Sequence, residues 1–168
     1  DSYPETTREI LCRVRGRERA LLLNLVPHET HEGTRIFCIG QDITERRRME
    51  LHLADHLVLT RSILDSIPNP VFHVGVDGSI LGVNQSFERF FGRDRNHFMG
   101  RKVGAWVGWD QEGTVDGHPG VSMARVERGD GRWAQVQLHR ATYADSSGKP
   151  AGVVGVLVDL SDLLEVEE

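Results

Sequence analysis

Apolar residues recur at every second position at residues 21, 23 and 25 and again at residues 134, 136 and 138, and each run follows a polar turn. A further apolar run follows each, within residues 33–44 and 148–161, and both copies close on aspartate, an aliphatic residue and a hydroxyl residue. Alternation with a period of two is typical of β-strands with one buried face. The repeat therefore predicts two related units that end in the same group of strands.

In this chain, only the second unit also contains N-terminal elements ahead of these strands. Residues 71–76 and 79–83 are two short apolar runs joined by Asp77-Gly78, which predicts a tight hairpin. Asn84 is placed to cap a short helix, which carries apolar residues at helical spacing until Gly92.

The rest of the second unit is predicted to be mainly strand. Glycines interrupt residues 104–120 repeatedly, so we expect no long helix there. Three strands are expected afterwards, over residues 121–127, 132–141 and 151–159.

Residues 45–67 lie between the two units and contain neither glycine nor proline, which predicts a linker helix. Pro68 and Pro70 end it. Five positions in this segment follow one another at alternating spacings of four and three residues, which predicts a short heptad-type contact line along the helix. We call this line the seam, and it consists of Leu53, Leu57, Thr60, Leu64 and Ile67.

The composition, with 39% hydrophobic residues among 168, supports a real core and excludes a disordered chain. A net charge of −5 argues against a nucleic-acid partner. No apolar run approaches the roughly 20 residues that span a bilayer, so we expect no membrane segment. Cys12 and Cys38 lie in apolar runs and are expected to be buried free thiols, which fits a cytoplasmic location.

The order of two strands, short helices and three strands resembles a PAS domain. The resemblance covers residues 64–162 as a whole domain and residues 5–45 as the last three strands of a preceding one. The matching motifs are Ser66-Ile67-Pro68-Asn69-Pro70-Val71-Phe72, Asp77-Gly78-Ser79-Ile80-Leu81-Gly82-Val83-Asn84, Phe87 with Phe91-Gly92, Met99-Gly100, Asp42-Ile43-Thr44-Glu45-Arg46 and Asp159-Leu160-Ser161-Asp162.

The resemblance implies an α+β fold, with a PAS-like five-stranded antiparallel sheet and short helices on one face. A three-stranded partial PAS unit and a linker helix precede it. The expected divisions are a partial domain over residues 1–44, a helical linker over 45–67, a complete domain over 68–162 and the start of an output helix over 163–168.

PAS resemblance also implies a sensory role within a larger bacterial-type signalling protein, which begins before Asp1 and continues after Glu168. The parent is expected to be a histidine kinase or a diguanylate cyclase or phosphodiesterase, and this fragment is not expected to be an enzyme. The alternative is a module for dimerisation and interaction that binds no ligand.

A small ligand is expected between the sheet and the helices, although the same aromatic residues would also serve simply to fill the core. The sequence requires no cofactor or metal. Flavin and haem lack a supporting motif, residues 64–168 contain no cysteine for a flavin adduct, and His118 is not expected to bind haem. The candidate pocket residues are Phe72, His73, Asn84, Phe87, Phe91, Trp106, Trp109, Val136 and Leu138.

The repeated strand endings are candidate signal junctions. Thr44 and Ser161 are expected to act as N-caps of the helices that follow, and Asp42 and Asp159 precede them by two residues. The functional interpretation is that these junctions pass strain from sheet to helix, whereas ordinary capping explains the same residues.

Two surfaces are expected to need cover. The last strand is apolar on both faces, so its outer side is expected to meet the linker helix or a second chain, and we expect a homodimer through these elements. The partial unit is expected to bury one face against a second copy, by strand exchange or on the linker helix. That face consists of Ile10, Cys12, Val14, Leu21, Leu23, Leu25, Ile36 and Cys38.

Overall fold

The computed structural model describes residues 6–108 and 120–161 of the chain. It divides into two compact units, Asp1–Leu59 and Thr60–Glu168, and the boundary falls within one long helix.

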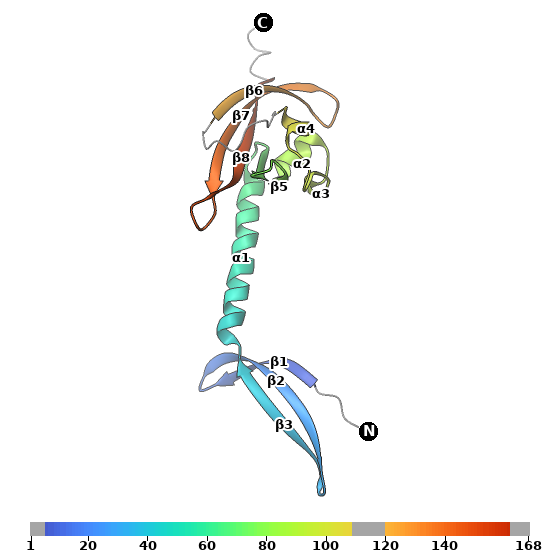
Figure 1. The fold of residues 1–168 in the computed structure, drawn as a ribbon, viewed down its shortest axis with the longest axis vertical. Coiled ribbons are helices and arrows are strands. Elements are labelled where there is room, and N and C mark those ends of the chain that lie inside the picture. Colours follow the sequence, from blue (N-terminus) through green and yellow to red (C-terminus); the bar gives the residue numbers. More distant parts are fainter. Residues whose placement is uncertain (1–5, 109–119, 162–168) are drawn as a thin grey trace. The chain divides into compact units, whose positions relative to one another are not determined.

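The first unit is an antiparallel meander (Figure 1). Its sheet has the order β1-β2-β3, and the first part of helix α1 follows it. The strands are β1 (Thr6–Val14), β2 (Arg17–Thr30) and β3 (Gly33–Asp42), and the helix is α1 (Thr44–Ser66). The predicted three-stranded sheet is therefore confirmed.

Both faces of this first sheet carry exposed apolar side chains. Residues that pair across antiparallel strands share a face, and Leu25 pairs with Cys38. Ile36 on this face is 69% exposed, and Phe37 on the other is 57% exposed. The prediction of buried thiols is wrong, because Cys38 is exposed and Cys12 is half-buried. No second layer of described residues covers their strands.

Helix α1 confirms the predicted linker helix. Several of its apolar side chains are exposed, including those of Leu53 and Leu57 in the predicted seam. None of the helices in the described part of the chain has both the length and the apolar character that a membrane span requires.

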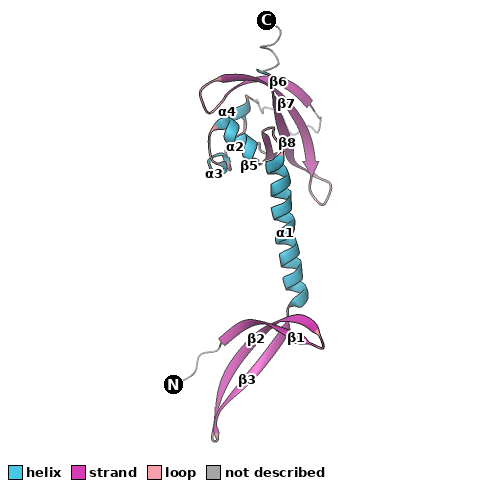
Figure 2. Cartoon of the chain, turned by 180° about the vertical axis from the view of Figure 1, so that it is seen from behind, coloured by secondary structure: helices cyan, strands magenta, loops and turns pink. Residues whose placement is uncertain are grey.

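The second unit is a five-stranded antiparallel sheet with the order β5-β4-β8-β7-β6. Three short helices pack on one face (Figure 2). The strands are β4 (Val71–Gly75), β5 (Ile80–Val83), β6 (Gly120–Glu127), β7 (Trp133–Ala144) and β8 (Pro150–Asp159). The helices are α2 (Gln85–Phe91), α3 (Arg95–Phe98) and α4 (Gly104–Val107).

Local sequence signals account for the helix ends. The side chain of Asn84 accepts the amide hydrogen of Phe87 and caps α2. Gly92 ends α2 with φ of 65°, a left-handed conformation that glycine adopts without a Cβ penalty. Both predictions for this helix are therefore confirmed.

The core lies between the helices and the inner face of the sheet. Val153 and Leu157 of β8 are buried there, whereas Val154, Val156 and Val158 point to the other face and are half-buried. The predicted two-sided character of this strand is confirmed. The core cluster also includes the rings of Phe72, Phe87, Phe91 and Phe98.

Gly155 of β8 makes room for one of these rings. It pairs with Phe72 across the sheet, and a Cβ at this glycine would lie 2.2 Å from Cζ of Phe72. The missing side chain therefore allows the Phe72 ring to lie over the strand, where it also meets Phe87 at a centroid distance of 5.9 Å.

We expect Gly155→Ala to destabilise the second unit by about 1–3 kcal/mol, because the new methyl group overpacks the core against Phe72. Denaturant unfolding followed by tryptophan fluorescence reports on this unit, since all three tryptophans lie within it. Combining Gly155→Ala with Phe72→Leu should cost less than the sum of the two single changes. Additive costs would contradict the proposed clash.

Candidate functional site

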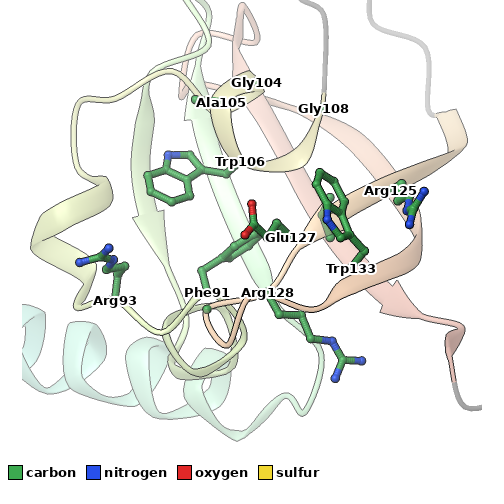
Figure 3. A pocket seen from close by; sticks show the side chains of 13 residues that line it. Phe91, Arg93, Gly104, Ala105, Trp106, Gly108, Arg125, Glu127, Arg128 and Trp133 are labelled. Atoms are coloured by element: carbon green, nitrogen blue, oxygen red, sulfur yellow. The ribbon is translucent and has the colours of Figure 1, made fainter.

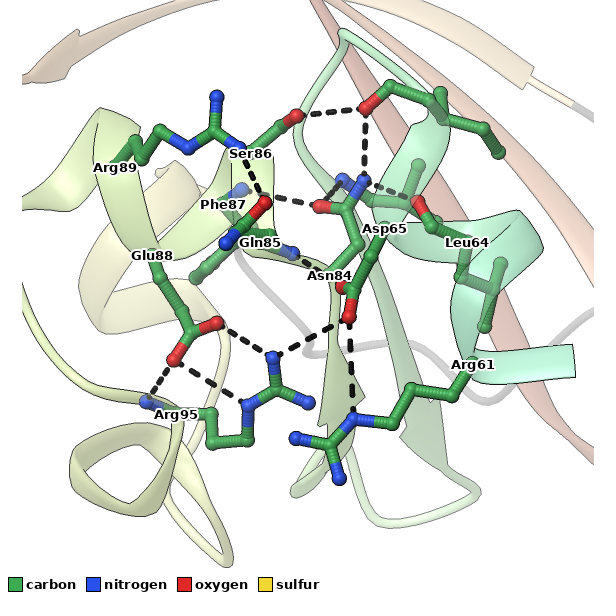
Figure 4. Close-up of polar contacts among 12 residues, drawn as sticks. Arg61, Leu64, Asp65, Asn84, Gln85, Ser86, Phe87, Glu88, Arg89 and Arg95 are labelled. Carbon is green, nitrogen blue, oxygen red and sulfur yellow. Dashed lines mark hydrogen bonds and ion pairs between the residues drawn. The ribbon is translucent and has the colours of Figure 1, made fainter. Parts of the chain in front are cut away.

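A buried amide joins the C-terminal end of α1 to the start of α2 (Figure 4). Asn84 is only 2% exposed. Its Nδ2 donates to the carbonyl oxygens of Leu64 at 3.0 Å, Ile67 at 3.3 Å and Asn69 at 3.0 Å. Its Oδ1 accepts the amide hydrogens of Val71 at 2.9 Å and Phe87 at 3.0 Å. One side chain thus holds the end of a helix, the connecting turn, a strand and a helix cap.

Two further side chains strengthen this connection. The carboxylate of Asp65 accepts the backbone amide hydrogen of Gln85 at 2.7 Å, and the hydroxyl of Ser86 donates to the carbonyl of Ile67 at 2.6 Å. We call Asp65, Asn84 and Ser86, with the groups they bind, the helix latch. Its bonds join α1 and the following turn to the start of α2, and those of Asn84 also reach β4 and cap α2.

Charged residues extend the latch toward α3. Asp65 lies 3.8 Å from Nε of Arg61 and 3.7 Å from Nη2 of Arg95, which pairs with Glu88 at 2.7 Å (Figure 4). The hydrogen bond to Glu88, together with the charges of Glu88 and Asp65, raises the pKa of Arg95 above its ordinary value. The network links helices α1, α2 and α3 through alternating charges.

At the first candidate junction, the capping acceptor is the aspartate. Oδ1 of Asp42 accepts the amide hydrogen of Thr44 at 3.0 Å and also the Thr44 hydroxyl hydrogen, and these bonds lower the pKa of Asp42. The hydroxyl oxygen of Thr44 accepts the amide hydrogen of Ala20 at 3.0 Å. The prediction that Thr44 caps α1 is therefore corrected, because its oxygen holds the helix start to β2 instead.

The second candidate junction repeats this arrangement. Oδ1 of Asp159 accepts the amide hydrogen of Ser161 at 3.0 Å, as Asp42 does for Thr44. The amides that the Ser161 hydroxyl would cap lie outside the described residues, so its role as an N-cap stays a prediction. Asp159 also pairs with the guanidinium of Arg128. Burial raises the pKa of Asp159, but the bonds from Ser161 and the charge of Arg128 outweigh it and lower the pKa overall.

Most of the predicted pocket residues come together, and they form part of the packed core. The Phe87 ring lies 4.6 Å from Phe91 and 5.0 Å from Phe98, and Phe91 lies 5.9 Å from Trp106, measured between centroids. Val136 and Leu138 are buried against the same cluster. Trp109 and His118 lie outside the described residues.

Some of the predicted pocket residues border two hollows. Phe91 and Trp106 line one of about 530 Å³ beside α4 and the β6–β7 turn. Phe72, His73 and Asn84 border another, of about 270 Å³, with Leu64 and outer-face residues of the sheet.

The second hollow is mainly apolar, and the ionisable side chains that line it are those of His73 and Tyr143. Burial lowers the pKa of His73 below its ordinary value, and its ring lies 6.3 Å from that of Tyr143 between centroids. Leu64, at the end of α1, borders this hollow together with Val154 on the outer face of β8.

The structure also identifies residues that the pattern analysis did not select. Asp65 and Arg128 contact residues 20 or more positions away, and no local motif marks them. The polar turn at residues 128–132 precedes the repeated strand ending, and it could have suggested Arg128 as the ion-pair partner of Asp159. Among the described residues, no group of three or more His, Cys, Asp or Glu side chains is arranged to hold a metal ion.

Comparison with known proteins identifies relatives of the second unit in particular. A family model described as the PAS fold matches residues 64–165. The virulence sensor protein BvgS of Bordetella bronchiseptica is 25% identical over 150 residues, and the match covers 78% of this chain and 12% of that protein.

Solved PAS domains show the same fold. The PAS domain of an HTR-like protein from Haloarcula marismortui matches with a TM-score of 0.58 and 21% identity, and it covers 67% of this chain and 98% of that one. The PAS domain of Bordetella pertussis BvgS gives 0.50 and 23% identity, with coverage of 66% and 93%.

We expect Asn84→Ala to destabilise the second unit by about 2–4 kcal/mol, because the change leaves buried backbone groups without partners and removes a helix cap. Tryptophan fluorescence during urea unfolding of the whole chain measures this loss. Asn96→Ala, at an exposed position of α3, serves as the control and should have little effect. Equal losses for the two variants would contradict the structural role of the latch.

Proposed function

The chain belongs to the PAS fold family, and on that premise we propose that it is the sensory module of a histidine kinase. The family supports a sensory, signalling role, and the resemblance to BvgS supports a sensor protein as the parent. The chain spans only 12% of the length of BvgS, so the catalytic output would reside in other parts of the protein. In this proposal the fragment itself carries out no reaction.

The observation that carries the proposal is the buried amide of Asn84. A sensor must connect the state of its core to a neighbouring helix, and hydrogen-bond networks between rigid elements are one way to carry such coupling. Asn84 joins the carbonyl groups at the end of α1 to β4 and to the cap of α2. A shift of α2 against the sheet would therefore alter the end of α1.

The aspartates of the two strand endings support a second connection. Asp42 and Asp159 each accept the amide hydrogen of a residue two positions later, where a strand gives way to the next segment. We propose that these junctions carry the change onward, with Arg128 modulating the second through its ion pair. Ordinary capping is compatible with this role, because the same hydrogen bonds both stabilise each junction and hold its backbone in one conformation.

The ligand proposed for the inner site would bind among Phe72, Phe87, Phe91, Trp106, Val136 and Leu138. These side chains are closely packed, so binding would require a second arrangement of the core with different affinity for the ligand. The free thiols of Cys12 and Cys38 support a cytoplasmic setting, where thiols stay reduced.

The test uses the full-length protein and measures autophosphorylation. We expect Asp65→Asn to change its rate by about fivefold, because the substitution weakens the latch through Arg61 and Arg95 while keeping the side-chain length. The matched control is Asp55→Asn, at an exposed position of the same helix.

Thermal unfolding of both variants checks that the fold is retained. Equal rates for wild type and Asp65→Asn would contradict the coupling. Absence of autophosphorylation in the folded wild-type protein supplied with ATP would contradict the histidine kinase output.

A second function, dimerisation without a ligand, is favoured by the exposed seam on α1. Leu53 and Leu57 are 61% and 62% exposed although they occupy core positions of the predicted heptad pattern. We propose that two copies of the chain pair along this seam, alone or together with ligand sensing. The closely packed core supports this alternative, because it leaves the inner aromatic residues in mutual contact.

We expect Leu57→Ser to weaken self-association by about tenfold, because it removes an apolar side chain from the seam. Analytical ultracentrifugation over a concentration series measures the dissociation constant. Leu59→Ser is the matched control, since Leu59 is similarly exposed but lies off the seam. A monomer at all concentrations, or equal effects of both changes, would contradict dimerisation along the seam.

A further inference from the structure

The cleft between α4 and the β6–β7 turn has an aromatic lining. It measures about 530 Å³, and Phe91, Trp106 and Trp133 contribute rings to it (Figure 3). Trp133 is 57% exposed, although indole is a large and mostly apolar group. The volume lies in the range of small-molecule sites. We call this space the two-tryptophan cleft.

Among the described residues that border this cleft, one carries a carboxylate. Glu127 of β6 pairs with Trp133 of β7 across the sheet, so the two side chains emerge next to each other. Figure 3 shows the carboxylate of Glu127 between the indole rings of Trp106 and Trp133. Within the described part of the chain, this carboxylate has no ion-pair partner.

Three arginines also border the cleft, yet their charges are directed elsewhere. Arg128 pairs with Asp159 and lies over Phe90, and Arg125 lies over the Trp133 ring at 5.2 Å from its centroid. In Figure 3 the guanidinium groups of Arg93, Arg125 and Arg128 extend away from Glu127. Arg125 lies over one face of the Trp133 ring, so a bound cation would contact the other face of that ring.

We propose that the two-tryptophan cleft binds a small organic ammonium ion. The indole faces attract a cation through their quadrupoles, the methyl or methylene groups of an organic ammonium contact the rings, and Glu127 supplies the opposite charge. An inorganic cation would lack the apolar contacts, and an anion would lie against Glu127. The neighbouring arginines oppose binding, and this opposition is weakened by salt and by the direction of their guanidinium groups, which extend away from Glu127.

This site goes beyond the proposed sensory function and is independent of the helix latch. It lies at the rim of the core, whereas the ligand expected from the sequence would lie in the core itself. Arg128 connects the site to the second junction, because it borders the cleft and pairs with Asp159. Binding can be measured whether or not the parent protein is a kinase.

The test titrates the whole chain with choline and follows the indole N–H signals of Trp106 and Trp133 by NMR at constant ionic strength. We expect saturable shifts of both signals. The neutral isostere 3,3-dimethylbutan-1-ol should bind about tenfold more weakly, because it has the same shape without the charge.

Two variants test the named groups. Glu127→Gln and Trp133→Leu should each raise the dissociation constant for choline about tenfold. Arg93→Gln should leave binding unchanged or tighten it, because it removes a like charge. Glu50→Gln removes the same charge as Glu127→Gln from an exposed residue that does not border the cleft, and it should have no effect.

Each opposite result would overturn the proposal. Absence of saturable shifts would exclude the site, and equal binding of the neutral isostere would show a merely apolar hollow. Unchanged affinity in Glu127→Gln would remove the role of the carboxylate. A circular dichroism spectrum of each variant verifies that loss of binding does not result from unfolding.

Discussion

The buried side-chain amide of Asn84 is the interaction on which the second unit depends. An amide removed from water must satisfy both its donors and its acceptor, and the Asn84 side chain does so entirely with backbone groups. Those groups belong to the end of α1, the connecting turn, β4 and α2. The position of the helix end against the sheet is therefore fixed by polar satisfaction as well as by apolar packing.

A second constraint in this unit is the space over Gly155, which sets where the aromatic rings pack. Without a side chain at that position, the Phe72 ring lies on β8 and meets Phe87, and the remaining rings pack behind them. The interior is consequently filled by side chains, while hollows remain at its margins. The two proposed ligand sites differ in this respect, because one requires the core to rearrange and the other is already open.

Much of the fold could be predicted from periodicity and turn chemistry. The strands of both units, the linker helix and the Asn84 and Gly92 ends of α2 follow from local patterns. Local reasoning was wrong about the role of Thr44, because Asp42 accepts the amide hydrogen at the helix start and the Thr44 hydroxyl oxygen binds Ala20 instead. It was also wrong about Cys38, since an apolar strand is buried only where another layer covers it.

The sequence by itself determined the order of the elements, the repeated strand endings and the resemblance to PAS domains, because periodicity, caps and turns act between residues close in the chain. The tertiary structure decided the contacts of Asn84 with α1, the pairing of Arg128 with Asp159 and the position of Glu127 beside Trp133 and Trp106. These contacts depend on strand register and on how helices pack over the sheet. Each joins elements through side chains whose partners no local pattern specifies.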